Sequence, residues 1–116
     1  MKKELDERLY KYSLDIIKLS DHLSKDISGQ TIARQLVRSG TSVTANIKEA
    51  KAASSKKDYV NFYHYALKSA NETELWLSLA TDSGKVDRKK AEKLFKETRE
   101  IAKILAASII TMKKNI

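Results

Sequence analysis

The sequence predicts an all-α protein, an antiparallel four-helix bundle whose helices run up, down, up and down. Three observations predict this class: the 116 residues include no proline, they include only three glycines, and four segments carry apolar residues at alternating spacings of three and four. Proline and glycine are the residues that interrupt helices, so their scarcity favours long helices joined by few turns. Four helices of similar length with short connections fold most simply as such a bundle, here a single domain over residues 1–116.

Local signals place the ends of the helices. Gly29 interrupts the first apolar pattern, and Ser55 followed by Asp58 three residues later is a variant of the capping box. Gly84 and Asp87 supply a C-terminal stop and then an N-cap. We therefore expect helices near residues 3–26, 29–53, 56–82 and 88–114.

Each expected helix carries one apolar seam that we predict forms the core. The seams are, in chain order, Leu5, Leu9, Tyr12, Ile16, Leu19 and Leu23; Ile32, Leu36, Ser39, Val43, Ile47 and Ala50; Tyr59, Tyr63, Ala66, Ala70, Thr73 and Leu77; and Ala91, Leu94, Thr98, Ile101, Leu105, Ser108 and Met112.

Two of the helices carry a second row of mostly apolar residues outside the seam. The rows are Tyr10, Leu14 and Ile17 on the first helix, and Phe62, Tyr65, Ser69, Glu72, Trp76 and Leu79 on the third. Scattered exposed apolar residues are normal, and a monomer with a broad core would account for one or two of them. Aligned aromatic residues are more typical of protein–protein contact, so we predict a homo-oligomer with the outer faces of the first and third helices as its main interface.

A few polar residues lie beside the seams, and they allow two interpretations. They are Ser42, Asn46 and Glu49 on the second helix, and Glu74 on the third. Glu49 paired with Glu72 or Glu74 would suit acid–base catalysis, whereas hydrogen bonds from such groups would fix the register between helices or subunits. We favour the structural interpretation.

The search for catalytic and metal motifs gives no further support to an enzyme. The chain has no cysteine, its glycines are isolated, and neither His22 nor His64 stands in a Glu-x-x-His motif. We therefore predict that the protein is not an enzyme, has no metal site, cofactor or small-molecule substrate, and lies in the cytoplasm. The start of the chain lacks a signal-peptide pattern, and no stretch is apolar enough to span a membrane.

The net charge of +8 is concentrated in two segments. Residues 85–116 have ten basic and four acidic side chains, residues 25–54 have five and two, and the rest of the chain is nearly balanced. Such a face either serves solubility or binds a polyanion, and we favour contacts to nucleic-acid phosphates without base readout. The residues we expect to make them are Arg34, Lys48, Lys51, Lys85, Arg88, Lys89, Lys93, Lys96, Arg99 and Lys103.

Three stretches resemble a known bacterial family. They are QLVRSGTSVTANIKEA at 35–50, SKKDY at 55–59 and ALKSANETE at 66–74. The resemblance is to four-helix-bundle proteins encoded in intervening sequences of 23S ribosomal RNA genes, with Ala50 in place of the usual glycine. The positions that match the family pattern are Ser42, Asn46, Glu49, Ser55, Asp58, Ser69, Glu72 and Glu74.

The resemblance has implications for fold, assembly and function. It implies an antiparallel bundle that assembles as a ring-like homopentamer. A related accessory protein of diversity-generating retroelements binds nucleic acid and a reverse transcriptase through its basic surface.

We expect a non-catalytic homo-oligomer that binds nucleic acid or acts as a scaffold, with RNA phosphates, or DNA, held by a basic face on the second and fourth helices. One alternative is a protein–protein assembly module, such as an accessory factor of a polymerase or reverse transcriptase, without direct nucleic-acid binding. A third possibility is an enzyme built around Glu49 and Glu72.

Overall fold

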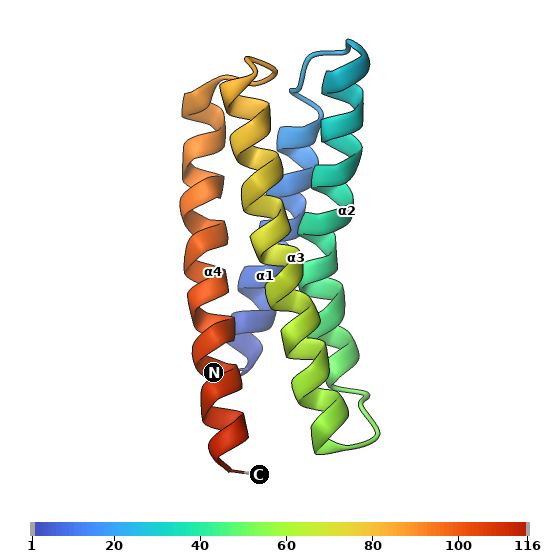
Figure 1. The fold of residues 1–116 in the computed structure, drawn as a ribbon, viewed down its shortest axis with the longest axis vertical. Coiled ribbons are helices and arrows are strands. Elements are labelled where there is room, and N and C mark those ends of the chain that lie inside the picture. The colour runs from blue at the N-terminus through green and yellow to red at the C-terminus, as the bar shows by residue number, and fades with distance from the viewer. Residues whose placement is uncertain (1, 116) are drawn as a thin grey trace.

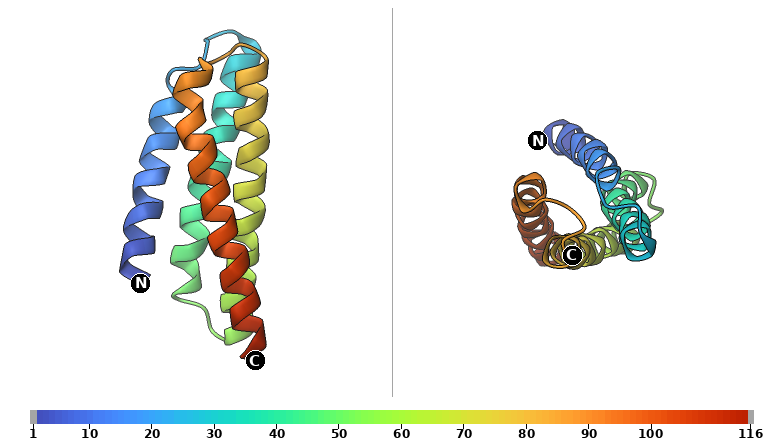
Figure 2. Two further views of the ribbon diagram at one scale, coloured as in Figure 1. Left: turned by 90° about the vertical axis from the view of Figure 1, so that its left-hand side faces the viewer. Right: turned by 90° about the horizontal axis from the view of Figure 1, so that it is seen from above.

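Four helices run alternately up and down along one long axis, as the sequence predicts (Figure 1). The computed structural model describes residues 2–115, and its helices are α1 (Lys2–Ser20), α2 (Ile27–Ala50), α3 (Lys56–Asp82) and α4 (Arg88–Lys114). Each helix packs against the next in the chain and α4 also borders α1, so that α1 lies diagonally opposite α3 and α2 opposite α4 (Figure 2).

The starts of α3 and α4 follow from local capping, and both were predicted correctly. The Ser55 hydroxyl accepts a hydrogen bond from the backbone N–H of Asp58, and the Asp87 carboxylate accepts one from the N–H of Lys89. Each satisfies a backbone donor that the first helical turn leaves without a partner. Between them, Gly84 has a φ of 74°, which lets the chain reverse after α3.

The connection between α1 and α2 differs from the prediction, because α1 ends at Ser20 rather than near residue 26. The Ser20 hydroxyl donates to the carbonyl of Ile16 at 2.8 Å, and a ring nitrogen of His22 donates to the carbonyl of Lys18 at 2.8 Å. The backbone N–H of His22 donates to the carbonyl of Leu19 at 2.9 Å, which departs from the α-helical pattern, and the His22 ring takes its place at the carbonyl of Lys18. Leu23 is buried as predicted, but it lies in the loop.

The break predicted at Gly29 is wrong, because α2 begins at Ile27 with Asp26 as its N-cap. The Asp26 carboxylate accepts from the Gly29 N–H at 2.9 Å and pairs with Lys85 at 2.9 Å. The Lys85 ammonium and the Gly29 amide hold the pKa of Asp26 below its usual value. A Cβ on Gly29 would lie 2.1 Å from the carbonyl oxygen of Ser24, so this glycine permits close packing of the loop rather than ending a helix. The other end of α2 is also shorter than expected, at Ala50 rather than 53.

The core is formed by the four predicted seams, with small differences at their ends. Ser108 is half-buried and the neighbouring Ile109 is buried in its place. The seam residues at the rim are half-buried: Leu5, Ile32, Tyr59 and Met112.

A hydrogen-bonded polar layer with one side chain from each helix crosses the middle of this core. The Tyr12 hydroxyl lies 2.7 Å from that of Thr98, and the Thr73 hydroxyl lies 2.9 Å from that of Ser39. All four side chains are buried, and desolvation raises the pKa of Tyr12 to about 12, so its hydroxyl keeps its proton. Because each buried hydroxyl has a partner, the layer favours a single register of the four helices.

The packing of Ile16 of α1 against α2 depends on Gly40. A Cβ at this position would lie 2.7 Å from Cγ2 of the fully buried Ile16. Overpacking of this kind costs about 1–3 kcal/mol, which exceeds the gain of about 1 kcal/mol in helix propensity from Gly to Ala. Gly40→Ala is therefore expected to lower the free energy of unfolding in urea by about 1 kcal/mol.

The control for Gly40→Ala is the reverse change at exposed Ala45 on the same helix, which measures propensity alone. Ala45→Gly should cost about 1 kcal/mol. A Gly40→Ala protein more stable than the wild type would show that Ile16 moves aside without cost.

Candidate functional site

Three lysines at seven-residue spacing form a stripe along the exposed side of α4. Lys89, Lys96 and Lys103 lie on one face of the helix because seven residues complete two helical turns. Lys96 lies 3.3 Å from Glu92 in an exposed pair, whereas among the ion pairs of the described residues none involves Lys89 or Lys103. Exposed pairs contribute little, so this stripe, here called the α4 stripe, is close to a row of free ammonium groups.

The other predicted basic residues of the α4 region are engaged in pairs. Arg88 lies 3.1 Å from Asp82, and Arg99 lies 3.9 Å from Glu74 with its guanidinium 5.9 Å from the ring centre of Phe95. The Lys85–Asp26 pair joins the α3–α4 loop to the start of α2, and the backbone N–H of Ser24 donates to the Lys85 carbonyl at 2.9 Å. Lys85 therefore connects the α3–α4 loop to the α1–α2 loop at one end of the bundle.

The basic residues of α2 do not continue the α4 stripe. Arg34 and Lys48 are exposed and Lys51 pairs with Asp6 of α1, but α2 and α4 lie diagonally opposite each other in the bundle. The expectation of one basic face across both helices is corrected: the two sets of side chains lie on different sides of the bundle.

The basic residues of α1 join those of α4 instead, in a groove that sequence reasoning missed. The groove between α1 and α4 has a volume of about 780 Å³, and six of its lining side chains are basic while three are acidic. From α4 it includes the predicted Lys93 and Lys96, and from α1 it adds Arg8, Lys11 and Lys18. These α1 residues could be found in the sequence, but the basic and acidic side chains of residues 1–24 cancel to a net charge of zero, so this segment was not predicted to be part of a basic surface.

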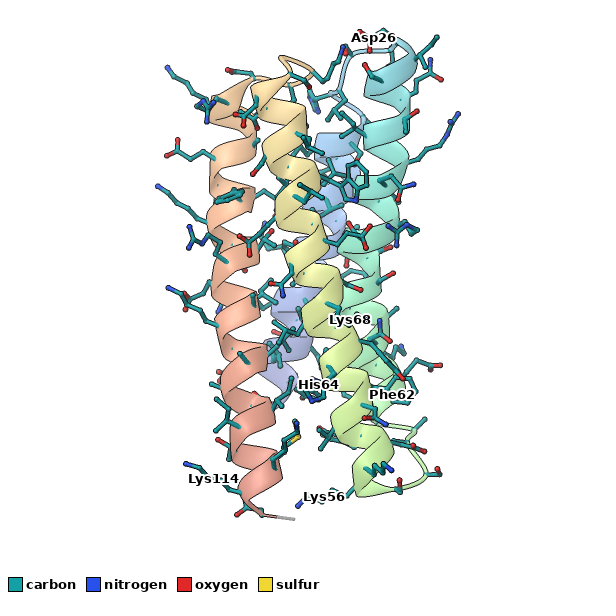
Figure 3. The ribbon with its side chains drawn as sticks, viewed as in Figure 1. Asp26, Lys56, Phe62, His64, Lys68 and Lys114 are labelled. Carbon is teal, nitrogen blue, oxygen red and sulfur yellow. The ribbon has the colours of Figure 1, made fainter. Side chains whose placement is uncertain are left out.

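The apolar row of α1 is exposed, as expected for a contact surface. Tyr10 is 66 % exposed, and Leu14 and Ile17 are each 41 % exposed. The row on α3 is only partly exposed: Tyr65 and Leu79 are exposed, while Phe62 and Trp76 pack against the core. In Figure 3, Phe62 projects toward α2, whereas His64 projects toward α4. Because α1 and α3 are diagonal, the two rows lie on separate sides of the molecule.

Glu72, in the middle of the α3 row, is held by two partners. It accepts a hydrogen bond from Nε1 of Trp76 at 2.9 Å and forms an ion pair with Arg38 of α2. The Trp76 hydrogen bond, together with the Arg38 guanidinium, lowers the pKa of Glu72. Half-buried Ser69 lies one turn before Glu72 and lines a shallow depression with it.

The fluorescence of Trp76, the single tryptophan, should report the protonation of Glu72. As the pH falls from 6 to 2, the emission is expected to change with a midpoint below 4.5, the ordinary value for Glu, because the carboxylate bound to Nε1 resists protonation. The ionised Glu72 carboxylate stabilises the fold through its two partners, Trp76 and Arg38. This contribution is complete above the ordinary pKa of a glutamate and is lost as the pH falls through the lowered pKa. Glu72→Gln should remove this transition, and a midpoint at or above 4.5 would contradict the bonding described.

The predicted polar residues of α2 and α3 separate into different surroundings. The Ser42 hydroxyl donates to the carbonyl of Arg38, the Asn46 amide donates to the carbonyl of Ser42, and Glu49 is exposed. Glu74 lies toward Arg99 of α4, away from Glu72, and the depression beside Glu72 is not lined by Glu49. The structure therefore does not bring Glu49 and Glu72 together in that depression.

Within residues 2–115 the structure has no group of three or more His, Asp or Glu side chains placed to hold a metal ion. None of the four helices over the same residues combines the length and apolar character needed to cross a membrane.

These features define a basic antiparallel four-helix bundle with exposed apolar faces. The chain belongs to the 23S rRNA-intervening sequence protein family, whose family model matches residues 3–107. It is similar to the crystal structure of a protein of unknown function from the S23 ribosomal protein family of Bacteroides thetaiotaomicron. The two are 35% identical with a TM-score of 0.83, over 90% of this chain and 96% of that chain. No curated protein matches the chain.

Proposed function

We propose that this protein is a non-catalytic homo-oligomer that binds RNA phosphates through the α4 stripe. The observation that carries the proposal is the row of Lys89, Lys96 and Lys103, of which two have no ion pair among the described residues. Lysine ammonium groups on an exposed helix face bind phosphate as point charges, without reading bases. A chain without cysteine is compatible with the cytoplasm, where we place it.

Two further features support this proposal. The excess of six positive charges over residues 85–116 would be repeated in every copy of an oligomer, which strengthens attraction for a polyanion. The family description refers to 23S ribosomal RNA, so RNA is the first nucleic acid to test.

The proposal is tested by titrating labelled RNA and DNA with the protein at 50 mM salt. The variant Lys89→Ala/Lys96→Ala/Lys103→Ala, here the stripe triple, is expected to bind RNA at least about tenfold more weakly, because three phosphate contacts are lost. The control removes the same charge from three exposed lysines elsewhere, Lys3, Lys57 and Lys68, and should change affinity less than about threefold.

No binding of either nucleic acid by the wild type would overturn the proposal. If the oligomer were then still present, the alternative of a protein–protein assembly module would take its place.

We also propose that the oligomer forms between the apolar row of α1 in one copy and the row of α3 in the next. The two rows differ in sequence and lie on separate sides of the bundle, so a contact between them is head-to-tail. Repeated head-to-tail contacts close into a ring when the rotation between copies allows it. A ring of five is the state that the family resemblance implies.

A further inference from the structure

The groove between α1 and α4 is positively charged mainly at one end. Lys18 of α1 and Lys90 and Lys93 of α4 line it near the α1–α2 connection, and no ion pair among the described residues includes any of them. Toward the other end the charges are balanced within the protein. Arg8 and Glu97 form two hydrogen bonds of 2.7 Å, and Lys11 pairs with Asp15 at 3.1 Å.

The length of the groove and the kinds of side chain that line it indicate what it can bind. Its α1 wall runs from Arg8 to Leu19, about 17 Å at 1.5 Å per residue, and His22 of the following turn extends it to about 20 Å. Its apolar lining residues, Tyr12, Leu19 and Leu94, are already buried in the core. No exposed Phe, Tyr or Trp ring lines the groove, whereas six basic side chains do, so charge is the main source of affinity for a polyanion.

We propose that this groove holds a single strand of RNA, with its phosphates at Lys18, Lys90 and Lys93. The inference deepens the proposed function and depends on it. A positively charged groove that follows the backbone is the usual site for a single strand. Domains dedicated to double-stranded RNA span about 16 base pairs, which is longer than a groove of about 20 Å.

The groove also joins the α4 stripe, which gives the strand a continuous path. Lys93 lies four residues after Lys89 and three before Lys96, so these side chains are neighbours on the surface of α4. A strand that leaves the positively charged end of the groove therefore meets the stripe directly. Because no exposed Phe, Tyr or Trp ring lines the groove and lysines bind phosphate as point charges, the binding should show little base preference.

The test compares a labelled 12-nucleotide single strand with the duplex it forms with its complement, both at 50 mM salt. The groove variant Lys18→Ala/Lys90→Ala/Lys93→Ala is expected to weaken binding of the single strand about tenfold and of the duplex less than threefold. The stripe triple should weaken both ligands, the single strand somewhat more because Lys96 also lines the groove, and the triple at Lys3, Lys57 and Lys68 should weaken neither. Circular dichroism verifies that each variant keeps its helices.

A charge-preserving variant separates phosphate binding from other roles of these lysines. Lys18→Arg/Lys90→Arg/Lys93→Arg should bind the single strand within about twofold of the wild type, since a guanidinium also binds phosphate. A loss equal to that of the alanine variant would contradict the proposal.

The experiment separates a failure of the groove site from a failure of RNA binding as a whole. If the wild type binds RNA but the groove variant loses no more affinity for the single strand than for the duplex, the groove inference is wrong and the proposed function stands. If the wild type binds neither ligand, both are wrong.

Discussion

The double variant Leu14→Gln/Ile17→Gln is expected to have the mass of a 13.2 kDa monomer, whereas the wild type is expected to have a multiple of it. Leu14 and Ile17 lie one turn apart on α1 and are each 41 % exposed in the isolated chain. Their side chains contribute to the apolar row that we propose contacts α3 of a neighbouring copy. Polar amides in the centre of such an interface remain imperfectly paired, and substitutions there disrupt association strongly.

Light scattering coupled to size exclusion measures these masses. The matched control is Ile110→Gln, which changes an apolar residue of α4 that is 58 % exposed and lies outside both rows. Its mass should equal that of the wild type. Trp76→Ala is a less specific test, because Trp76 also packs against the core and holds Glu72. A monomeric wild type, or a double variant of unchanged mass, would contradict the proposed interface.

Thr98→Val is expected to lower the free energy of unfolding by about 1–2 kcal/mol, more than Tyr12→Phe does. The Thr98 hydroxyl donates to the carbonyl of Leu94 at 2.8 Å, so the Tyr12 hydroxyl at 2.7 Å acts as the donor to Thr98. Valine removes this acceptor and leaves the buried phenol hydroxyl with Thr73 as its one remaining side-chain partner. Tyr12→Phe removes that donor, and Thr98 keeps its bond to Leu94, so the expected loss is below about 1 kcal/mol.

Urea denaturation of the two single variants and the double variant measures this difference. The double variant should be closer in stability to Tyr12→Phe than to Thr98→Val, because the unpaired hydroxyl is then absent. If Tyr12→Phe costs more than Thr98→Val, the assignment of donor and acceptor is wrong.

The parts of the fold that were predictable depend on neighbours in sequence. Ser55 and Asp87 cap their helices through amides two or three residues later, so α3 and α4 begin where the sequence indicates. The start of α2 was misplaced because Gly29 is a helix breaker by propensity, whereas its real role is to admit the carbonyl of Ser24. That role exists only once the loop has folded back, with Lys85 paired to Asp26 59 residues away.

The sequence indicated which residues of the candidate site are charged, but not which helices lie next to one another. The sequence identified Lys89, Lys93, Lys96 and Lys103 of α4 and missed Lys90, and it placed the basic residues of α2 beside them, because helix faces alone do not say which helices are adjacent. The bundle instead places α1 beside α4, so that Lys18 joins Lys90 and Lys93. The pairing of Lys51 with Asp6, 45 residues apart, is likewise invisible in a count of charges along the chain.

The most direct test of the central claim is the dependence of RNA affinity on salt for the wild type and the stripe triple. Each phosphate contact of a single strand contributes about 0.7 to the slope of log affinity against log salt concentration, so three lost contacts should make the slope shallower by about 2. The triple at Lys3, Lys57 and Lys68 should keep the slope of the wild type. If the stripe triple also keeps that slope, these lysines do not contact phosphate and the proposed function is contradicted.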